Sequence, residues 1–158
     1  MKTWKGNLII RNGMDLGQFK DLEEVKGYLF VYEGADFTAP ALASVGGDLC
    51  VDADFTAPIL PYCPEGELIA WKKCQNDVMV RLRIPVEARR IGLSTGKCRA
   101  EYAEVLEVIG AEIGVSKHEA GFVYRVGEIV RSDSFNESLT TCSNGIHFFL
   151  TREQAEEY

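Results

Sequence analysis

The chain has 158 residues and a formal net charge of −7, with 46% hydrophobic and 26% charged residues. This composition is typical of a globular protein with one domain or two small ones, and it excludes an intrinsically disordered chain. The acidic balance argues against nonspecific binding to duplex nucleic acid, and the lack of a long apolar segment or signal peptide predicts a cytoplasmic protein without a membrane partner.

One pattern occurs three times in the first part of the chain. A glycine precedes two apolar residues that stand two positions apart, at residues 6–10, 27–31 and 47–51. Residues 36–40 then recur letter for letter as residues 54–58. Apolar residues at positions i and i+2 point to the same face of a strand, and a period of about 20 residues is typical of a solenoid. We therefore expect the strands of successive repeats to stack on one another.

The predicted stack contains Leu8, Leu29 and Leu49, and we extend it to Leu68 because the segment around that residue continues the pattern. One coil buries about five apolar side chains, worth on the order of 10 kcal/mol, which is less than the entropy lost on ordering about 20 residues. Coils are therefore stable only when stacked. We predict a short parallel β-solenoid of about three to four coils, mainly over residues 1–62. Its first edge carries a single tryptophan as a cap, so we also expect a homodimer through the solenoid edge.

Residues 63–158 are predicted to form a small α+β domain that caps the solenoid, so that the whole chain is mainly β with an α/β C-terminal part. Residues 85–90 begin with proline and predict a short helix. Residues 102–109 fit a helical stripe or a strand, and we favour the strand. Thr151 and Gln154 form a capping box that begins a terminal helix. Further strands are expected at residues 67–74, 78–84, 122–126, 128–130 and 145–150.

Charge is distributed unevenly, and this is the main chemical signal in the sequence. Residues 72–99 contain eight basic and two acidic residues, whereas residues 100–158 contain four basic and eleven acidic ones. Apolar residues that alternate with Arg81 and Arg83 predict a half-buried strand with arginines on its outer face. Two interpretations stay open: a solvated face that pairs with the acidic C-terminal part, or a site for an anion, a nucleotide or nucleic acid. The candidate residues, which we call the basic stripe, are Lys72, Lys73, Arg81, Arg83, Arg89, Arg90, Lys97 and Arg99.

The cysteines and histidines give no sign of a metal or cofactor site. Five cysteines without a C-x-x-C pair predict thiols in a reducing compartment, and the two histidines, His118 and His147, stand far apart. The loop at residues 92–98 departs from a Walker motif in its spacing, but its glycines and neighbouring basic residues keep a small anionic ligand as an alternative. We expect no cofactor and assign no catalytic residue.

Two segments resemble parts of bacteriophage proteins. The repeat A-L-A-S-V-G-G-D-L at residues 41–49 resembles tandem solenoid repeats of phage and prophage proteins. Residues 67–158, through motifs such as C-S-N-G-I-H-F-F-L-T-R, resemble a domain of unknown function that occurs at the C-terminus of phage proteins and of some pentapeptide-repeat proteins. The resemblance implies a non-enzymatic phage accessory protein in the host cytoplasm. We expect it to bind and modulate a host macromolecule, for example as an inhibitor of a defence system such as a CRISPR nuclease.

A second resemblance implies an enzyme. Residues 145–149, followed by Ala155 and Tyr158, are similar to a strand and helix of ADP-ribosyltransferase-like and RNA 2′-phosphotransferase-like folds. The resemblance implies that Tyr124 and His147 line a nicotinamide pocket for NAD and that Arg125 lies near the phosphates. Those enzymes carry a catalytic glutamate on a strand beyond this helix, which the sequence lacks. We therefore favour a binding protein, in which His147 is partly buried with one ring nitrogen bonded to backbone.

Overall fold

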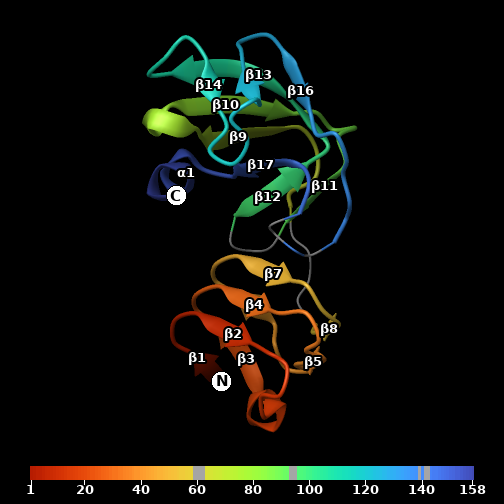
Figure 1. Ribbon diagram of the computed structural model, residues 1–158. Coiled ribbons are helices and arrows are strands. Elements are labelled where there is room, and N and C mark those ends of the chain that lie inside the picture. The colour runs from red at the N-terminus through yellow and green to blue at the C-terminus, as the bar shows by residue number, and fades with distance from the viewer. Residues whose placement is uncertain (59–62, 93–95, 139, 141–142) are drawn as a thin grey trace. The chain divides into compact units, whose positions relative to one another are not determined.

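The computed structural model describes residues 1–58, 63–92, 96–138, 140 and 143–158. The fold is mainly β, and the described residues divide into two compact units (Figure 1). The first unit is built on residues 1–58 and the second on residues 63–92, 96–137 and 143–158. The division into a solenoid and an α+β domain remains a prediction.

The first unit consists of short parallel strands that pair with their counterparts in the next repeat. Leu8 pairs with Leu29 and Leu29 pairs with Leu49, which confirms the predicted register for these three leucines. One sheet contains β2 (Leu8–Ile10), β4 (Leu29–Val31) and β7 (Leu49–Val51). A second contains β1 (Lys2–Trp4), β3 (Leu22–Val25) and β6 (Ser44–Val45), and a third contains β5 (Phe37–Thr38) and β8 (Phe55–Thr56).

The inward side chains of these sheets form one hydrophobic core. Leu8, Leu29 and Leu49 are each at most 2% exposed. The ring of Phe37 stacks on that of Phe55 at 5.8 Å between centroids, and it also meets the edge of Phe19, which ends a 3₁₀ helix η1 (Leu16–Phe19). Burial of this continuous column stabilises the repeats of about 20 residues against one another.

Glycines allow the repeats to approach closely at the corner before each strand. A Cβ atom on Gly27 would lie 2.7 Å from the carbonyl carbon of Gly6, in the preceding repeat. A Cβ atom on Gly47 would likewise lie 3.0 Å from the carbonyl carbon of Gly27. The backbone hydrogen bonds from Gly27 to Gly6 and from Gly47 to Gly27, at 3.0 and 2.9 Å, connect these corners. The repeated glycine is therefore a packing requirement.

The prediction of a fourth stacked strand is wrong. Leu68 lies on β9 (Leu68–Lys73) in the second unit, where it pairs antiparallel with Ile84. Alternation of apolar residues at i and i+2 is the same in parallel and antiparallel strands, so the pattern does not distinguish the two.

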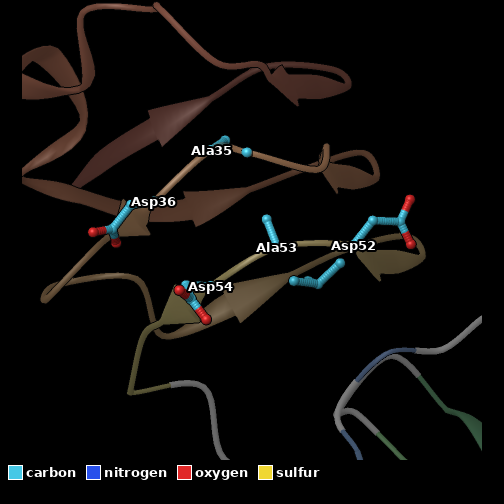
Figure 2. Close-up of a pocket in the computed structure, with 7 residues that line it drawn as sticks. Ala35, Asp36, Asp52, Ala53 and Asp54 are labelled. Atoms are coloured by element: carbon cyan, nitrogen blue, oxygen red, sulfur yellow. The ribbon is translucent and has the colours of Figure 1, made fainter.

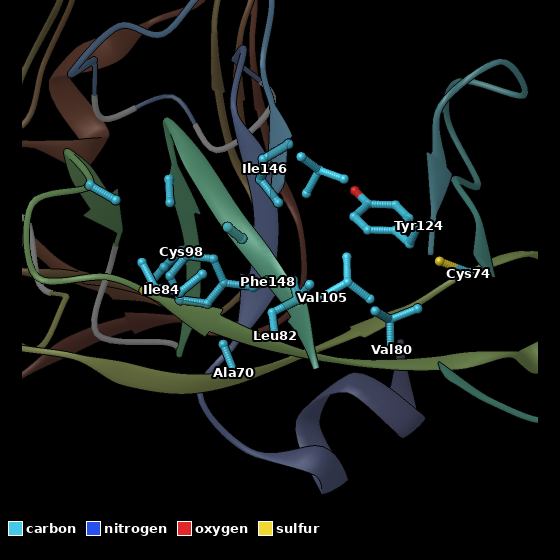
Figure 3. Packing of buried hydrophobic residues seen from close by; sticks show 14 of the residues in the cluster. Ala70, Cys74, Val80, Leu82, Ile84, Cys98, Val105, Tyr124, Ile146 and Phe148 are labelled. Atoms are coloured by element: carbon cyan, nitrogen blue, oxygen red, sulfur yellow. The ribbon is translucent and has the colours of Figure 1, made fainter. Parts of the chain in front are cut away.

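The second unit is a seven-stranded antiparallel sheet with strand order β11-β12-β17-β9-β10-β13-β16. Figure 3 shows the apolar side chains of one face, including Ala70, Leu82 and Phe148, packed into a core. Besides β9, the strands are β10 (Met79–Ile84), β11 (Arg90–Gly92), β12 (Lys97–Ala100), β13 (Tyr102–Ile109), β16 (Ile129–Arg131) and β17 (Ile146–Phe149). Outside this sheet lie η2 (Gln75–Asp77), the pair β14 (Gly114–Val115) and β15 (Val123–Tyr124), and the helix α1 (Arg152–Glu157).

Three local predictions for this unit have different outcomes. The strand favoured at residues 102–109 is confirmed as β13. The capping box is also confirmed, because the Thr151 hydroxyl accepts from the Gln154 amide at the start of α1. The helix predicted at residues 85–90 is wrong: a turn follows Pro85, and Arg90 already pairs with Ala100 in the sheet.

The cysteines depart from the expectation of five thiols. Cys50 is disulfide-bonded, whereas Cys63 and Cys74 are free. An odd number of cysteines leaves room for a bonded pair, which the sequence argument did not consider. Among the described residues, no helix combines the length and apolar character needed to cross a membrane, and no group of three metal-binding side chains occurs.

Candidate functional site

Three arginines of the basic stripe form ion pairs across neighbouring elements. Arg83 pairs with Glu104, which lies directly opposite on β13, and Arg81 lies 3.5 Å from Glu107 on the same strand. Arg89 forms a 3.3 Å pair with Glu101. All three arginines are more than a third exposed, so each pair contributes little to stability. Their charges face glutamates, as in the interpretation of a solvated paired face.

Two further arginines of the stripe donate hydrogen bonds to backbone carbonyls. Arg90 donates to the carbonyl of Gly66 at 2.6 Å, to that of Ala88 at 3.1 Å and to that of Pro85. Arg99 is 3% exposed and donates to the carbonyls of Asn136 and Asn144 at 3.1 and 2.7 Å. Burial lowers the pKa of Arg99.

The three lysines of the stripe gather elsewhere, at a small hollow beside α1. Their position follows from the sheet, because β9 and β17 meet at a single register pair, Trp71 with Phe149, and pair no further. Lys72 and Lys73 follow Trp71 at this point. The hollow, which we call the lysine hollow, is lined by Lys72, Lys73, Lys97, Lys117, His118, His147, Phe149 and Tyr158.

The deepest lysine of the hollow is Lys72, which is 8% exposed. Its Nζ atom donates to the carbonyl of His147 at 3.1 Å, where the pairing of β9 with β17 stops, and lies 5.7 Å from the ring centroid of Tyr124. Lys73 donates to the carbonyl of Glu156 at 2.9 Å and lies 3.2 Å from Asp77. The two lysines therefore connect β9 to β17 and to α1.

The aromatic ring of Tyr158 lies close to the other two lysines of the hollow, Lys97 and Lys117. The Nζ atoms of Lys97 and Lys117 lie 4.5 and 5.4 Å from its ring centroid, and its hydroxyl lies 3.1 Å from Nε2 of His118. The ring of Phe149 lies 5.3 Å from the same ring. Lys117 and His118 come from the segment between β14 and β15. This segment therefore meets β12, which carries Lys97, and the end of α1, which precedes Tyr158.

The pKa values in the hollow are shifted first by burial and then by neighbouring positive charge. Burial lowers the pKa of Lys72 to about 8; Cys74 opposes this change, and Lys97 and Lys117 add to it by repulsion. Burial lowers the pKa of His147 to about 4, and Lys72 and Lys97 lower it further. At neutral pH His147 is therefore uncharged. An anion in the hollow would favour the charged form of both groups.

The residues proposed for an NAD pocket are only partly together. Tyr124 is 2% exposed beneath Lys72, and His147 lines the lysine hollow. The Nε2–H of His147 donates to the Ser143 carbonyl at 2.9 Å, so this nitrogen is bonded to backbone as we expected. Arg125 is exposed, lies 3.9 Å from Glu128 and is not among the lining residues. The structure thus joins two of the three residues.

Sequence reasoning missed Lys117, His118 and Phe149 as lining residues. Lys117 and His118 are neighbours in the chain, but no repeat or motif surrounds them, and only the β14–β15 hairpin brings them to Tyr158. Part of the glycine-rich loop at residues 92–98, namely residues 93–95, lies outside the described residues.

The first unit carries a second, open hollow of opposite charge. Figure 2 shows Asp36 and Asp54 projecting from equivalent positions of successive repeats, with Ala35, Ala53 and Asp52 beside them. The three aspartates are exposed. We call this surface the acidic hollow.

Comparison with known proteins gave one match. A family model described as a family of unknown function, DUF5758, matches residues 59–155. Neither the curated proteins nor the solved structures contain a match.

Proposed function

Since the chain belongs to DUF5758, a family of unknown function, we propose its role from its own geometry: it is a binding protein that captures a phosphate-bearing ligand in the lysine hollow. The observation that carries the proposal is the convergence of four lysines, of which Lys73 is already paired with Asp77; His147 beside them is uncharged at neutral pH. Among the described residues that line the hollow, none has a carboxylate side chain. Like charges placed together in a partly buried site are costly unless an anion neutralises them.

The lining also suggests what the ligand carries besides phosphate. Lysine ammonium groups act as point charges that suit phosphate oxygens without imposing the planar geometry of arginine. Phe149 and Tyr158 offer aromatic rings beside those charges. The enclosed space is only about 10 Å³, so the hollow itself takes phosphate oxygens, and the base of a mononucleotide would lie outside it on the half-exposed ring of Tyr158.

Isothermal titration calorimetry with adenosine 5′-monophosphate tests this proposal, with adenosine as the ligand that lacks phosphate. We expect the nucleotide to bind and adenosine to bind at least tenfold more weakly. The double variant Lys97→Ala/Lys117→Ala should lose most of the affinity, whereas Lys5→Ala, an exposed lysine of the first unit, should not change it. Equal binding of both ligands, or an unchanged double variant, would refute the assignment.

We also propose that the parallel sheets of the first unit are coils of a short β-solenoid. The in-register pairing of Leu8, Leu29 and Leu49, the stacked rings of Phe37 and Phe55, and the glycine corners support this interpretation. Three coils of about 20 residues fit these contacts.

For the first unit we propose binding to a basic surface of a host macromolecule, in line with the resemblance to phage accessory proteins. The acidic hollow supports this, because Asp36 and Asp54 present carboxylates at a repeated spacing. Charge reversal at both positions, Asp36→Lys/Asp54→Lys, should abolish capture of that partner from host lysate. Capture that is insensitive to this change would place the contact elsewhere.

A further inference from the structure

Three aromatic side chains lie on the outward face of the middle repeat of the first unit. The strand β4 turns Leu29 and Val31 into the core. Tyr28, Phe30 and Tyr32 alternate with these residues and therefore lie on the opposite face. We call these three residues the aromatic row. Tyr32 is 44% exposed, and the other two are partly exposed, so solvent reaches the whole row.

The rings of the aromatic row are close together and stand at different angles. The ring centroid of Phe30 lies 4.9 Å from that of Tyr28, with an angle of 84° between the ring planes. On its other side it lies 6.4 Å from the centroid of Tyr32, with an angle of 31°. Ile9, the register partner of Phe30 on β2, is 36% exposed. The apolar surface therefore continues from β4 onto the preceding repeat.

The aromatic row ends beside the acidic hollow. The amide of Asp52 donates to the carbonyl of Val31 at 2.8 Å, which places Asp52 next to Tyr32 on the following repeat. Asp52 lines the acidic hollow together with Asp36 and Asp54 (Figure 2). An apolar aromatic surface and a group of exposed carboxylates are thus neighbours on one unit.

The charge around the row favours a cationic partner. Residues 1–58 contain nine acidic and five basic residues. The guanidinium of Arg11 lies 5.1 Å from the ring centroid of Tyr32, on the preceding repeat, whereas Asp52 and Asp54 belong to the following one. A nucleic-acid strand stacked on the rings would bring its phosphates toward these carboxylates, which disfavours it. A peptide with apolar rings and a positive charge suits both surfaces.

We propose that the aromatic row binds a proline-rich segment of a partner protein in the polyproline II conformation, with an arginine of that segment at the acidic hollow. The inference rests on the binding role proposed above for the first unit and names the class of its partner. A polyproline II helix rises about 3.1 Å per residue, so the ring spacings of 4.9 and 6.4 Å each match roughly two residues. Such a segment packs its prolines on aromatic side chains and loses little conformational entropy on binding.

NMR titration of the full-length ¹⁵N-labelled protein tests the inference, because it detects weak binding and identifies the amides that respond. The probe is a peptide of eight prolines followed by two arginines. Two matched peptides replace the prolines by alternating glycine and serine, or the arginines by glutamates. We expect the probe to shift the amide signals of Phe30 and Tyr32, and each matched peptide to bind at least about fivefold more weakly.

Three variants locate the contact. Phe30→Leu/Tyr32→Leu removes two rings but keeps apolar side chains, and it should weaken binding of the probe at least about fivefold. Asp52→Asn/Asp54→Asn should weaken the probe but not a peptide of ten prolines. Tyr102→Leu is the matched control, since an arginine also covers this ring in the second unit, at 4.2 Å from its centroid, and it should bind the probe like wild type.

The outcomes separate this inference from the role on which it rests. Equal binding of the glycine–serine peptide with arginines would overturn the inference and leave the acidic hollow as a site for basic partners. No response to either basic peptide, or a response of the Phe30 and Tyr32 amides to maltohexaose or decathymidine instead of the probe, would overturn it as well. If Phe30→Leu/Tyr32→Leu does not fold, the comparison of peptides on the wild-type protein decides. The role itself fails separately, when charge reversal at Asp36 and Asp54 leaves capture of the host partner unchanged.

Discussion

At the scale of single residues, Lys72 shows how a buried charge in the lysine hollow reduces the stability of the protein. Lys72 is 8% exposed, and among the described residues no carboxylate lies within 4 Å of its Nζ atom. The fall of its pKa from 10.5 to about 8 corresponds to roughly 3 kcal/mol of unfavourable charge burial at neutral pH. The hydrogen bond from Lys72 to the His147 carbonyl offsets part of this cost.

We predict that Lys72→Met raises the free energy of unfolding at pH 7, by up to roughly 3 kcal/mol, while it weakens binding of adenosine monophosphate. Between pH 8 and 10.5 the unfolded chain binds more protons at Lys72 than the folded chain, so wild-type stability rises with pH in this window. The difference in unfolding free energy between wild type and variant should therefore shrink as the pH rises. Urea unfolding at pH 7, 9 and 10.5 measures it, and a constant difference would contradict the assignment.

His147 predicts a pH dependence of the same direction as that of Lys72, but at acidic pH. Its pKa is lowered from 6.5 to about 4, so above pH 6.5 both states are uncharged and stability is fully present. As the pH falls from 6.5 to 4, the unfolded state binds a proton that the folded state does not, and roughly 3 kcal/mol is lost. His147→Gln should remove this part of the acid dependence. Urea unfolding at pH 7 and 4.5 measures the free energy of unfolding of both proteins. An equal loss between these pH values in wild type and in the variant would disprove the assignment.

At the scale of elements, the repeat depends on glycines at its corners. We predict that Gly27→Ala destabilises the first unit by about 1–3 kcal/mol, because the new Cβ atom would lie 2.7 Å from the backbone of Gly6. Gly121→Ala is the matched control, since no heavy atom lies within 4 Å of its Cβ position. Circular dichroism during thermal unfolding compares them; equal losses in both variants would argue against close packing of repeats.

Strand contacts could be predicted in the first unit, where the sequence repeats with a period of about 20 residues. Leu8, Leu29 and Leu49 could be aligned because the same spacing recurs, whereas Leu68 imitates the pattern but belongs to an antiparallel pair with Ile84. Pro85 suggested a helix because local propensity favours proline in a first turn, but sheet pairing of the following residues decided the structure.

The candidate site was predictable only in part. The charge count identified Lys72, Lys73 and Lys97, but it also included arginines that face glutamates across strands. Sequence alone does not show which charges meet, because cross-strand register is set by the whole sheet. Lys117 and His118 enter the hollow through a hairpin that carries no charge pattern of its own.

At the scale of the whole molecule, each unit has its own buried cluster. We predict two transitions in differential scanning calorimetry. Leu29→Ala, which removes a fully buried side chain of the first cluster, should lower one midpoint, with a loss of about 2–5 kcal/mol. Saturating adenosine monophosphate should raise the other, because the ligand binds the folded second unit. A single transition that both changes shift would show that the units unfold together.

The residue-to-residue pairing of successive repeats has an evolutionary consequence. Because Leu29 occupies the place of Leu8 one repeat later, and Phe55 that of Phe37, duplication or loss of one complete repeat in frame leaves every inward position inward. Homologous genes should therefore differ in length by steps of about 20 codons within this region, whereas the antiparallel sheet beyond it tolerates no such stepwise growth.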